Sequence, residues 1–180
     1  MTVFIALFRG INVGGHKQVK MDVLKKLHES LGFRDVRTCV QSGNVVFKSS
    51  NADTVKIARQ IENAFERAYG FPAKVILRTS GELRAIVAKN PFHGQAGKEA
   101  KFLHVVFLTD RPDKKVTKEF LDGYSEPEEI HAADKELYIY YTNGAGRSKL
   151  TNTLIEKKLA VSCTARNWNT VTKLLDLVEA

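Results

Sequence analysis

With 180 residues, 43% of them hydrophobic and 27% charged, the chain has the composition of a globular protein with one medium or two small domains, which excludes disorder. The apolar run at residues 3–8 follows no basic segment and is too short for a signal peptide or a membrane span. The net charge of +8 suggests that the protein binds a polyanion or an anionic metabolite, or that it simply has a basic surface.

This charge is concentrated in two parts of the chain. Residues 1–50 carry eight Lys/Arg against three Asp/Glu, residues 51–143 carry fourteen against fourteen, and residues 144–180 carry six against three. The excess is therefore +5, zero and +3. Cys39 and Cys163 are the only cysteines, which together with the lack of a secretory signal predicts a reduced cytoplasmic protein with two free thiols. The lack of a membrane span predicts no membrane partner.

The first eighty residues predict a βαββαβ order. Apolar positions every three or four residues indicate the helices, and short β-rich runs indicate the strands. The predicted elements are a strand at 2–8, a helix from Met21 to Leu31, strands at 36–41 and 45–49 around a hairpin turn, a helix between Asp53 and Gly70, and a strand at 73–79.

The same order follows a second time. A short helix at 82–89 capped by Ser80, with a loop after it, forms the connection. The predicted elements are then a strand at 102–108, a helix after Asp113, strands at 129–132 and 136–142, a helix beginning at Ser148, a strand at 162–165 and a last helix at 171–178. The second helix of this half contains Leu150, Leu154 and Leu159.

This repeated order is the split βαββαβ pattern of the ferredoxin-like fold, or alpha-beta plait, in which two helices cover one face of a four-stranded antiparallel sheet. We therefore expect an α+β protein with ferredoxin-like subdomains at residues 1–80 and 102–180. A helix and loop at residues 81–101 join them, and the C-terminal helix falls outside the pattern.

Four loops are rich in Gly, Asn or Ser, and three of them also contain Lys or Arg, which favours binding of an anion by backbone N–H groups and positive side chains. The candidate ligand-binding residues are Arg9, Asn12, Gly14, Gly15, Lys17, Ser42, Asn44, Arg147, Ser148, Lys149, Arg166, Asn167 and Trp168. Two cations beside a helix start at Ser148 are unfavourable unless an anion joins them. The alternative is that a nearby carboxylate pairs with Arg147.

The other loops also have structural alternatives. The glycines after Gly10 do not have dinucleotide-binding spacing, and Gly14 or Gly15 can simply serve a turn with positive φ. Trp168 can stack on a base or anchor the last helix on its own domain. Ser42 and Asn44 can face a ligand or complete an ordinary hairpin turn.

Several catalytic, metal and cofactor motifs do not occur in the sequence. The five histidines have no metal-ligand spacing with each other or with the cysteines, and neither a Walker loop nor a GxSxG motif occurs. The sequence thus predicts no metal and no cofactor. Cys39 or Cys163 can be a nucleophile or an inert thiol.

Five segments together resemble one known family. They are FRGINVGG, KMDVLKKLHESLGF, VQSGNVVF, GRSKLTNTLIEKKL and TARNWNTVTKLL. In this order they are similar to the bacterial domain-of-unknown-function family numbered 1697. The resemblance implies a two-subdomain α+β protein of ferredoxin-like topology and no established activity.

Three hypotheses of function follow. In the first, the basic loops bind phosphate groups of a nucleotide or nucleic acid, with Trp168 stacking. In the second, a small enzyme acts on a phosphorylated or acylated metabolite, where Arg9 or Arg147 stabilises charge and Asn12 or Asn44 orients water. In the third, the protein has a purely structural or interaction role without a ligand.

Overall fold

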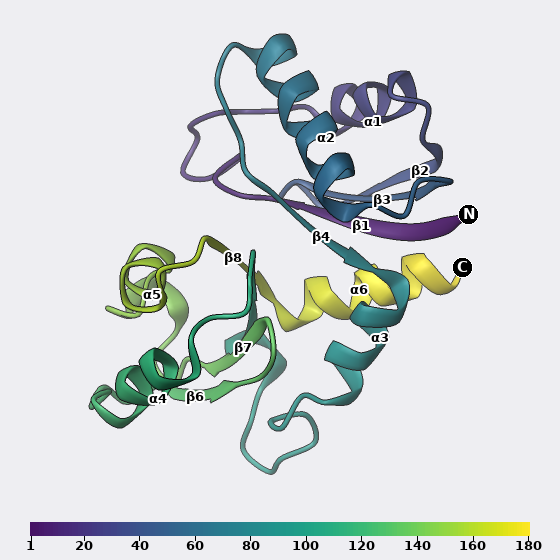
Figure 1. The fold of residues 1–180 in the computed structure, drawn as a ribbon. Coiled ribbons are helices and arrows are strands. Elements are labelled where there is room, and N and C mark those ends of the chain that lie inside the picture. Colours follow the sequence, from purple (N-terminus) through teal and green to yellow (C-terminus); the bar gives the residue numbers. More distant parts are fainter. The chain divides into compact units, whose positions relative to one another are not determined.

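A computed structural model describes residues 1–180. The chain divides into two units (Figure 1): the first unit contains residues 1–85 and 172–180, and the second unit contains residues 86–171. The domain boundaries expected at residues 80 and 101 remain a prediction.

The first unit contains one four-stranded antiparallel sheet. Its elements are β1 (Thr2–Phe8), α1 (Met21–Ser30), β2 (Arg34–Cys39), β3 (Asn44–Ser49), α2 (Thr54–Tyr69) and β4 (Val75–Thr79). The strand order is β2-β3-β1-β4, as in a ferredoxin-like fold. Figure 1 shows α1 and α2 on the same side of β1 and β3.

Alternation along β1 explains this packing. Phe4, Ala6 and Phe8 point to one face of the strand and join a buried cluster with Leu24 of α1 and Phe65 of α2. Ile5 and Leu7 on the opposite face are also buried, as expected for a strand that is apolar on both faces. The apolar stripes of the two helices therefore close the core of the first unit.

The second sheet repeats the topology. After α3 (Ser80–Ala88) and a short 3-10 helix η1 (Ala100–Phe102), the elements are β5 (Leu103–Leu108), α4 (Lys114–Asp122), β6 (Glu129–Ala132), β7 (Glu136–Tyr140), the 3-10 helix η2 (Ala145–Arg147), α5 (Asn152–Leu159), β8 (Cys163–Asn167) and α6 (Trp168–Glu179). All pairs are antiparallel and the strand order is β6-β7-β5-β8. The expected α+β class with two such sheets and a C-terminal helix is confirmed.

One expected helix start was wrong. Helix α5 begins at Asn152 and not at Ser148, because Thr151 is the N-cap and its side chain accepts a hydrogen bond from Leu154 N. Leu150 lies just before this cap and is buried in one cluster with Ile155, the arrangement of a hydrophobic staple. Leu150 therefore belongs to the approach to the helix, although its spacing fits the apolar stripe.

Two smaller differences concern the other helices. Helix α3 starts at Ser80 itself, where the sequence predicted a cap, and α6 starts at Trp168, three residues before the expected position. Both helices follow directly on a strand, so no separate loop marks their beginning. None of the helices combines the length and the apolar character needed to cross a bilayer.

Candidate functional site

The loop between β1 and α1 contains a tight two-residue turn. His16 N donates to Val13 O at 3.0 Å, and Gly14 and Gly15 between them have φ of +58° and +76°. Positive φ at both central residues is typical of a type I′ turn, which glycine adopts without strain. Gly14 and Gly15 therefore serve a turn with positive φ, as in the structural alternative to a ligand site, and both residues are exposed.

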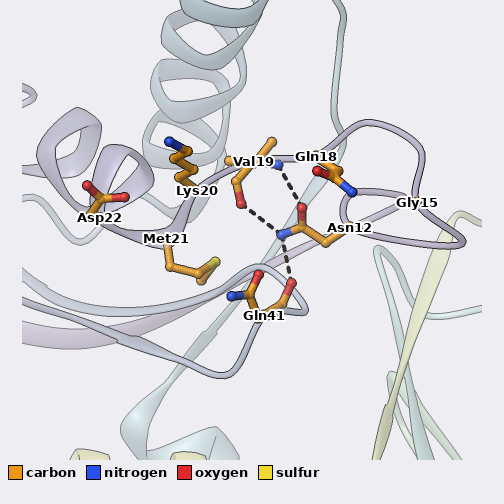
Figure 2. Close-up of a pocket in the computed structure, with 8 residues that line it drawn as sticks. All are labelled: Asn12, Gly15, Gln18, Val19, Lys20, Met21, Asp22 and Gln41. Carbon is orange, nitrogen blue, oxygen red and sulfur yellow. Dashed lines mark hydrogen bonds between the residues drawn. The ribbon is translucent and has the colours of Figure 1, made fainter.

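Asn12 ties this loop to the β2–β3 turn. Its Oδ1 accepts from Val19 N at 2.7 Å, while its Nδ2 donates to Val19 O at 3.0 Å and to Gln41 O at 2.7 Å. Figure 2 shows these three bonds. Asn12 also has φ of +54°, which asparagine tolerates better than most residues. Both Nδ2 hydrogens are thus used inside the protein, and we call this arrangement the Asn12 bridge.

Replacing Asn12 with Gly should lower the free energy of unfolding by about 2 kcal/mol. The three bonds of the Asn12 bridge are lost, and each contributes roughly 0.5–1.5 kcal/mol in a half-buried setting. Asn12→Ala should lose about 1 kcal/mol more, because alanine is strained at positive φ and glycine is not. Urea unfolding of both variants measures this difference. Equal stability of Asn12→Gly and wild type would show that the bridge holds nothing.

The β2–β3 turn is stabilised by hydrogen bonds from its own side chains. Asn44 is fully buried, and its Nδ2 donates to Cys39 O at 2.9 Å and to Ser42 Oγ at 2.7 Å. Gly43 O accepts from Phe8 N at 2.9 Å, which fixes the turn against the end of β1. The side chain of Asn44 thus completes the hairpin and does not face the surface. This was the ordinary alternative to a ligand-facing Asn44.

A pocket of about 480 Å³ lies between the β1–α1 loop, the start of α1 and the β2–β3 turn. Figure 2 shows Lys20, Met21 and Asp22 at the start of α1, with Asn12 and Gln41 facing them across the pocket. The lining residues are Asn12, Gly15, Gln18, Val19, Lys20, Met21, Asp22 and Gln41. We call this the α1 pocket. The Asn12 bridge positions one wall relative to the other.

The start of α1 lacks a side-chain cap. Lys20 occupies the N-cap position with extended backbone, and no side chain accepts a hydrogen bond from the first turn. The first N–H groups of a helix have no partner within the helix and carry partial positive charge. Lys20 is exposed and adds a full positive charge, whereas Asp22 in the same turn adds a negative one. The pocket therefore presents amide donors and one ion of each sign.

Two other N-terminal candidates lie outside this lining. The Lys17 ammonium lies 5.5 Å from the centre of the Phe71 ring, a cation–π contact. Arg9 is half-buried, and its backbone N donates to Lys74 O at 2.9 Å at the edge of the sheet. Neither residue lines the α1 pocket.

The segment around Arg147 is arranged differently from the expectation. Arg147 ends the 3-10 helix η2, and Ser148 Oγ donates to Glu128 Oε1 at 2.6 Å and accepts from Leu150 N. Lys149 pairs with Glu126 at 3.4 Å. Since α5 starts at Asn152 and Thr151 caps it, Ser148 does not begin an α-helix, and the expectation of two cations beside a helix start at Ser148 was wrong. Internal carboxylates partner two of these three residues.

The Glu128 carboxylate also accepts from Tyr124 OH at 2.6 Å. Burial raises the pKa of Glu128, but the hydrogen bonds from Ser148 and Tyr124 outweigh it together, and the pKa falls below its usual value. The hydroxyl of Ser148 thus serves to hold the chain before α5 against the segment before β6.

The last candidate loop is buried. Arg166 is 6% exposed, and its guanidinium donates to Thr164 Oγ1 at 2.7 Å and to Ala165 O at 2.9 Å. Desolvation lowers the pKa of Arg166 to about 10, which leaves it charged at neutral pH. Trp168 is 4% exposed and lies beside His93, with ring centres 5.7 Å apart. The indole therefore anchors the start of α6, as the structural alternative expected.

Asn167 completes this junction between strand and helix. Its Oδ1 accepts from Asn169 N, and its Nδ2 donates to Lys101 O, each at 2.9 Å. The polar atoms of Asn167 are thus used to start α6 and to hold the residues before β5. Neither Asn167 nor Trp168 offers a free face for a base.

The structure brings together fewer of the candidates than expected. Asn12, Gly15 and the turn containing Ser42 meet around the α1 pocket, whereas the candidates from Arg147 to Trp168 belong to the second unit. Sequence reasoning missed Gln18 and Gln41 in the lining. One signal in the sequence that could have indicated this site is the missing helix cap, since no Ser, Thr, Asp or Asn stands directly before Met21.

Comparisons with known proteins agree with this architecture. The family model described as "Protein of unknown function (DUF1697)" matches residues 1–138, so the segments at 146–159 and 164–175 lie outside the match. A solved structure, that of the conserved bacterial protein SP0830 from Streptococcus pneumoniae, is similar with a TM-score of 0.79 and 21% identity. The alignment covers 100% of this chain and 99% of that one, and it shows the fold alone. No curated protein matched.

Proposed function

The chain belongs to the DUF1697 family of proteins of unknown function, and we propose that its first unit is an anion-binding module with the α1 pocket as its site. The ligand is a phosphate group of a nucleotide or nucleic acid. The observation that carries the proposal is the uncapped start of α1, which lies in the wall of a pocket beside the ammonium of Lys20.

Other helices of the chain support this reading. Asp53, Asp113 and Thr151 cap α2, α4 and α5, and each accepts hydrogen bonds from the first turn of its helix. At α1 the residue in this position is a lysine, which leaves the same donors for an external acceptor. A phosphate oxygen provides both the acceptor and the negative charge that this helix end favours.

The remaining lining indicates more than inorganic phosphate. The pocket volume of about 480 Å³ is in the range of small-molecule sites, roughly 300–1,000 Å³. Gln18 and Gln41 add carboxamide groups that can donate to and accept from a base or sugar. The phosphate group is therefore expected at α1 and the rest of a nucleotide along Gln18 and Gln41.

The proposal includes a reduced compartment. Cys39 is half-buried, Cys163 is buried, and both are free thiols. Free cysteines are typical of cytoplasmic proteins, where nucleotides and nucleic acids are also found.

Substituting Lys20 should weaken anion binding by about fivefold, the factor that corresponds to an exposed charge pair of about 1 kcal/mol. Isothermal titration with pyrophosphate, AMP and a short single-stranded RNA compares wild type with Lys20→Gln. Lys26→Gln is the matched control, since Lys26 is an exposed lysine on the same helix that does not line the pocket. For RNA, affinity should also fall steeply with salt.

Asp22→Asn should have the opposite effect on anion binding. Removing the carboxylate from the lining should tighten binding severalfold, because a negative charge no longer repels the ligand. The same change should cost roughly 0.3–1 kcal/mol of stability, since Asp22 favours the helix end. Equal affinities of Lys20→Gln, Lys26→Gln and Asp22→Asn, or no binding of any of the three probes, would contradict the proposed site.

A further inference from the structure

A second pocket, of about 500 Å³, lies in the second unit between α4 and the β6–β7 turn. We call it the α4 pocket. Its wall contains Pro112, Leu121, Ala132 and Ala133, of which Pro112 is buried and the others are half-buried. In contrast to the α1 pocket, its surface is mainly apolar. A ligand with an apolar body thus removes this surface from water.

The polar groups around the α4 pocket already have partners, with one exception. Arg111 pairs with Asp134, and Lys118 pairs with Asp122. Thr117 Oγ1 donates to Asp113 O at 2.8 Å, and Ala133 N donates to Glu136 O at 2.8 Å. The ammonium of Lys114 is exposed and has no carboxylate partner. The lining therefore offers one uncompensated positive charge beside an apolar wall.

We propose that the α4 pocket binds a small amphipathic anion, an aliphatic or aromatic carboxylate whose carboxylate pairs with Lys114 and whose apolar part covers Leu121, Ala132 and Ala133. The unpaired positive charge of Lys114 favours the carboxylate of such a ligand, and the apolar wall favours its hydrocarbon part. A neutral apolar compound leaves Lys114 unpaired, and a polar anion such as phosphate leaves the wall exposed to water. This site is independent of the α1 pocket.

Titration of the full chain with hexanoate, octanoate and octanamide, followed by amide chemical shifts, tests the proposal. Octanoate should bind at millimolar concentration with shifts at α4 and at residues 132–134. Hexanoate should bind about tenfold more weakly, because each buried methylene contributes roughly 0.8 kcal/mol, a factor of three to four. Octanamide should bind about fivefold more weakly than octanoate, because it cannot form the ion pair.

Two variants separate the charge from the wall. Lys114→Gln should reduce the affinity for octanoate to that of octanamide and leave octanamide unchanged. Lys115→Gln, at an exposed neighbour that does not line the pocket, should change neither. Ala133→Phe should fill the pocket and abolish binding of both, with the thermal transition as a check of folding.

Three outcomes would overturn the inference. The first is equal affinity for octanoate and octanamide. The second is an octanoate affinity that Lys114→Gln and Lys115→Gln change equally, or no binding at all. The third is that the shifts at α4 follow protein concentration in the absence of ligand, which would assign the apolar wall to a second copy of the chain.

Discussion

Replacing Gly43 with Ala should lower the free energy of unfolding by about 3 kcal/mol. A Cβ at this position would lie 2.6 Å from Ile11 Cδ1 and 2.9 Å from Phe8 Cβ, distances that side chains do not adopt without displacement. Forcing a methyl group into a packed site costs roughly 1–3 kcal/mol, and the φ of +73° adds about 1 kcal/mol. Gly43 thus allows the β2–β3 turn to approach the β1–α1 loop.

Gly10 provides the matched control for this change. It has the same φ of +73°, but a Cβ there would have no heavy atom within 4 Å. Gly10→Ala should therefore cost about 1 kcal/mol, the backbone part alone. Urea unfolding of both variants gives the difference, which measures the close approach at Gly43. Equal losses would show that Ile11 and Phe8 move aside at no cost, and the packing described for the two loops would then be wrong.

Acid should destabilise the first unit through His28. The imidazole is fully buried among the rings of Phe8, Phe33 and Phe47, its Nδ1 donates to Leu24 O at 2.8 Å, and its Nε2 has no partner. Desolvation lowers its pKa from 6.5 to about 4. The neutral ring is thus the form that the folded core accepts.

The sign of the effect follows from the two pKa values. Between pH 6.5 and about 4 the unfolded chain binds a proton at His28 and the folded chain does not, so stability falls as the pH is lowered through this range. The full contribution, present above pH 6.5, is about 3 kcal/mol, since one pKa unit corresponds to about 1.4 kcal/mol. His104, whose pKa is also lowered by burial, adds a change of the same sign in the second unit.

Unfolding by urea at a series of pH values checks this prediction with His28→Leu. The variant should lose the part of the pH dependence that His28 contributes, whatever its stability at neutral pH. If wild type and His28→Leu showed parallel curves between pH 4 and pH 7, the imidazole would titrate normally in the folded state. Its burial among the three phenylalanine rings would then be contradicted.

The fold could be predicted because its signals are local. The caps at Asp53 and Asp113, the left-handed Gly70 after α2 and the continuous apolar run of β1 all appear in short stretches of sequence. The start of α5 could not, because Ser148 and Thr151 are both good capping residues. The choice between them depends on Leu150, which is buried before the cap rather than within the helix.

The candidate site was less predictable, because polar loop residues have partners that are distant in sequence. The Asn12 side chain donates to Gln41 O, 29 residues away, and the Ser148 hydroxyl donates to Glu128, 20 residues away. Before these contacts are known, an asparagine that binds a ligand and one that joins two loops look the same in sequence. FRGINVGG and VQSGNVVF are two of the segments that resemble the family, and they contact each other through Asn12 and Gly43.

The most direct test of the α1 pocket is a titration with pyrophosphate followed by amide chemical shifts. The proposal predicts that the largest shifts occur at the amides of Met21, Asp22 and Val23, whose N–H groups begin α1, and that Lys20→Gln reduces them. The first turn of α2, which Asp53 caps, should not respond. Shifts spread evenly over the lysines of the surface, or none at the start of α1, would contradict an anion site in this pocket.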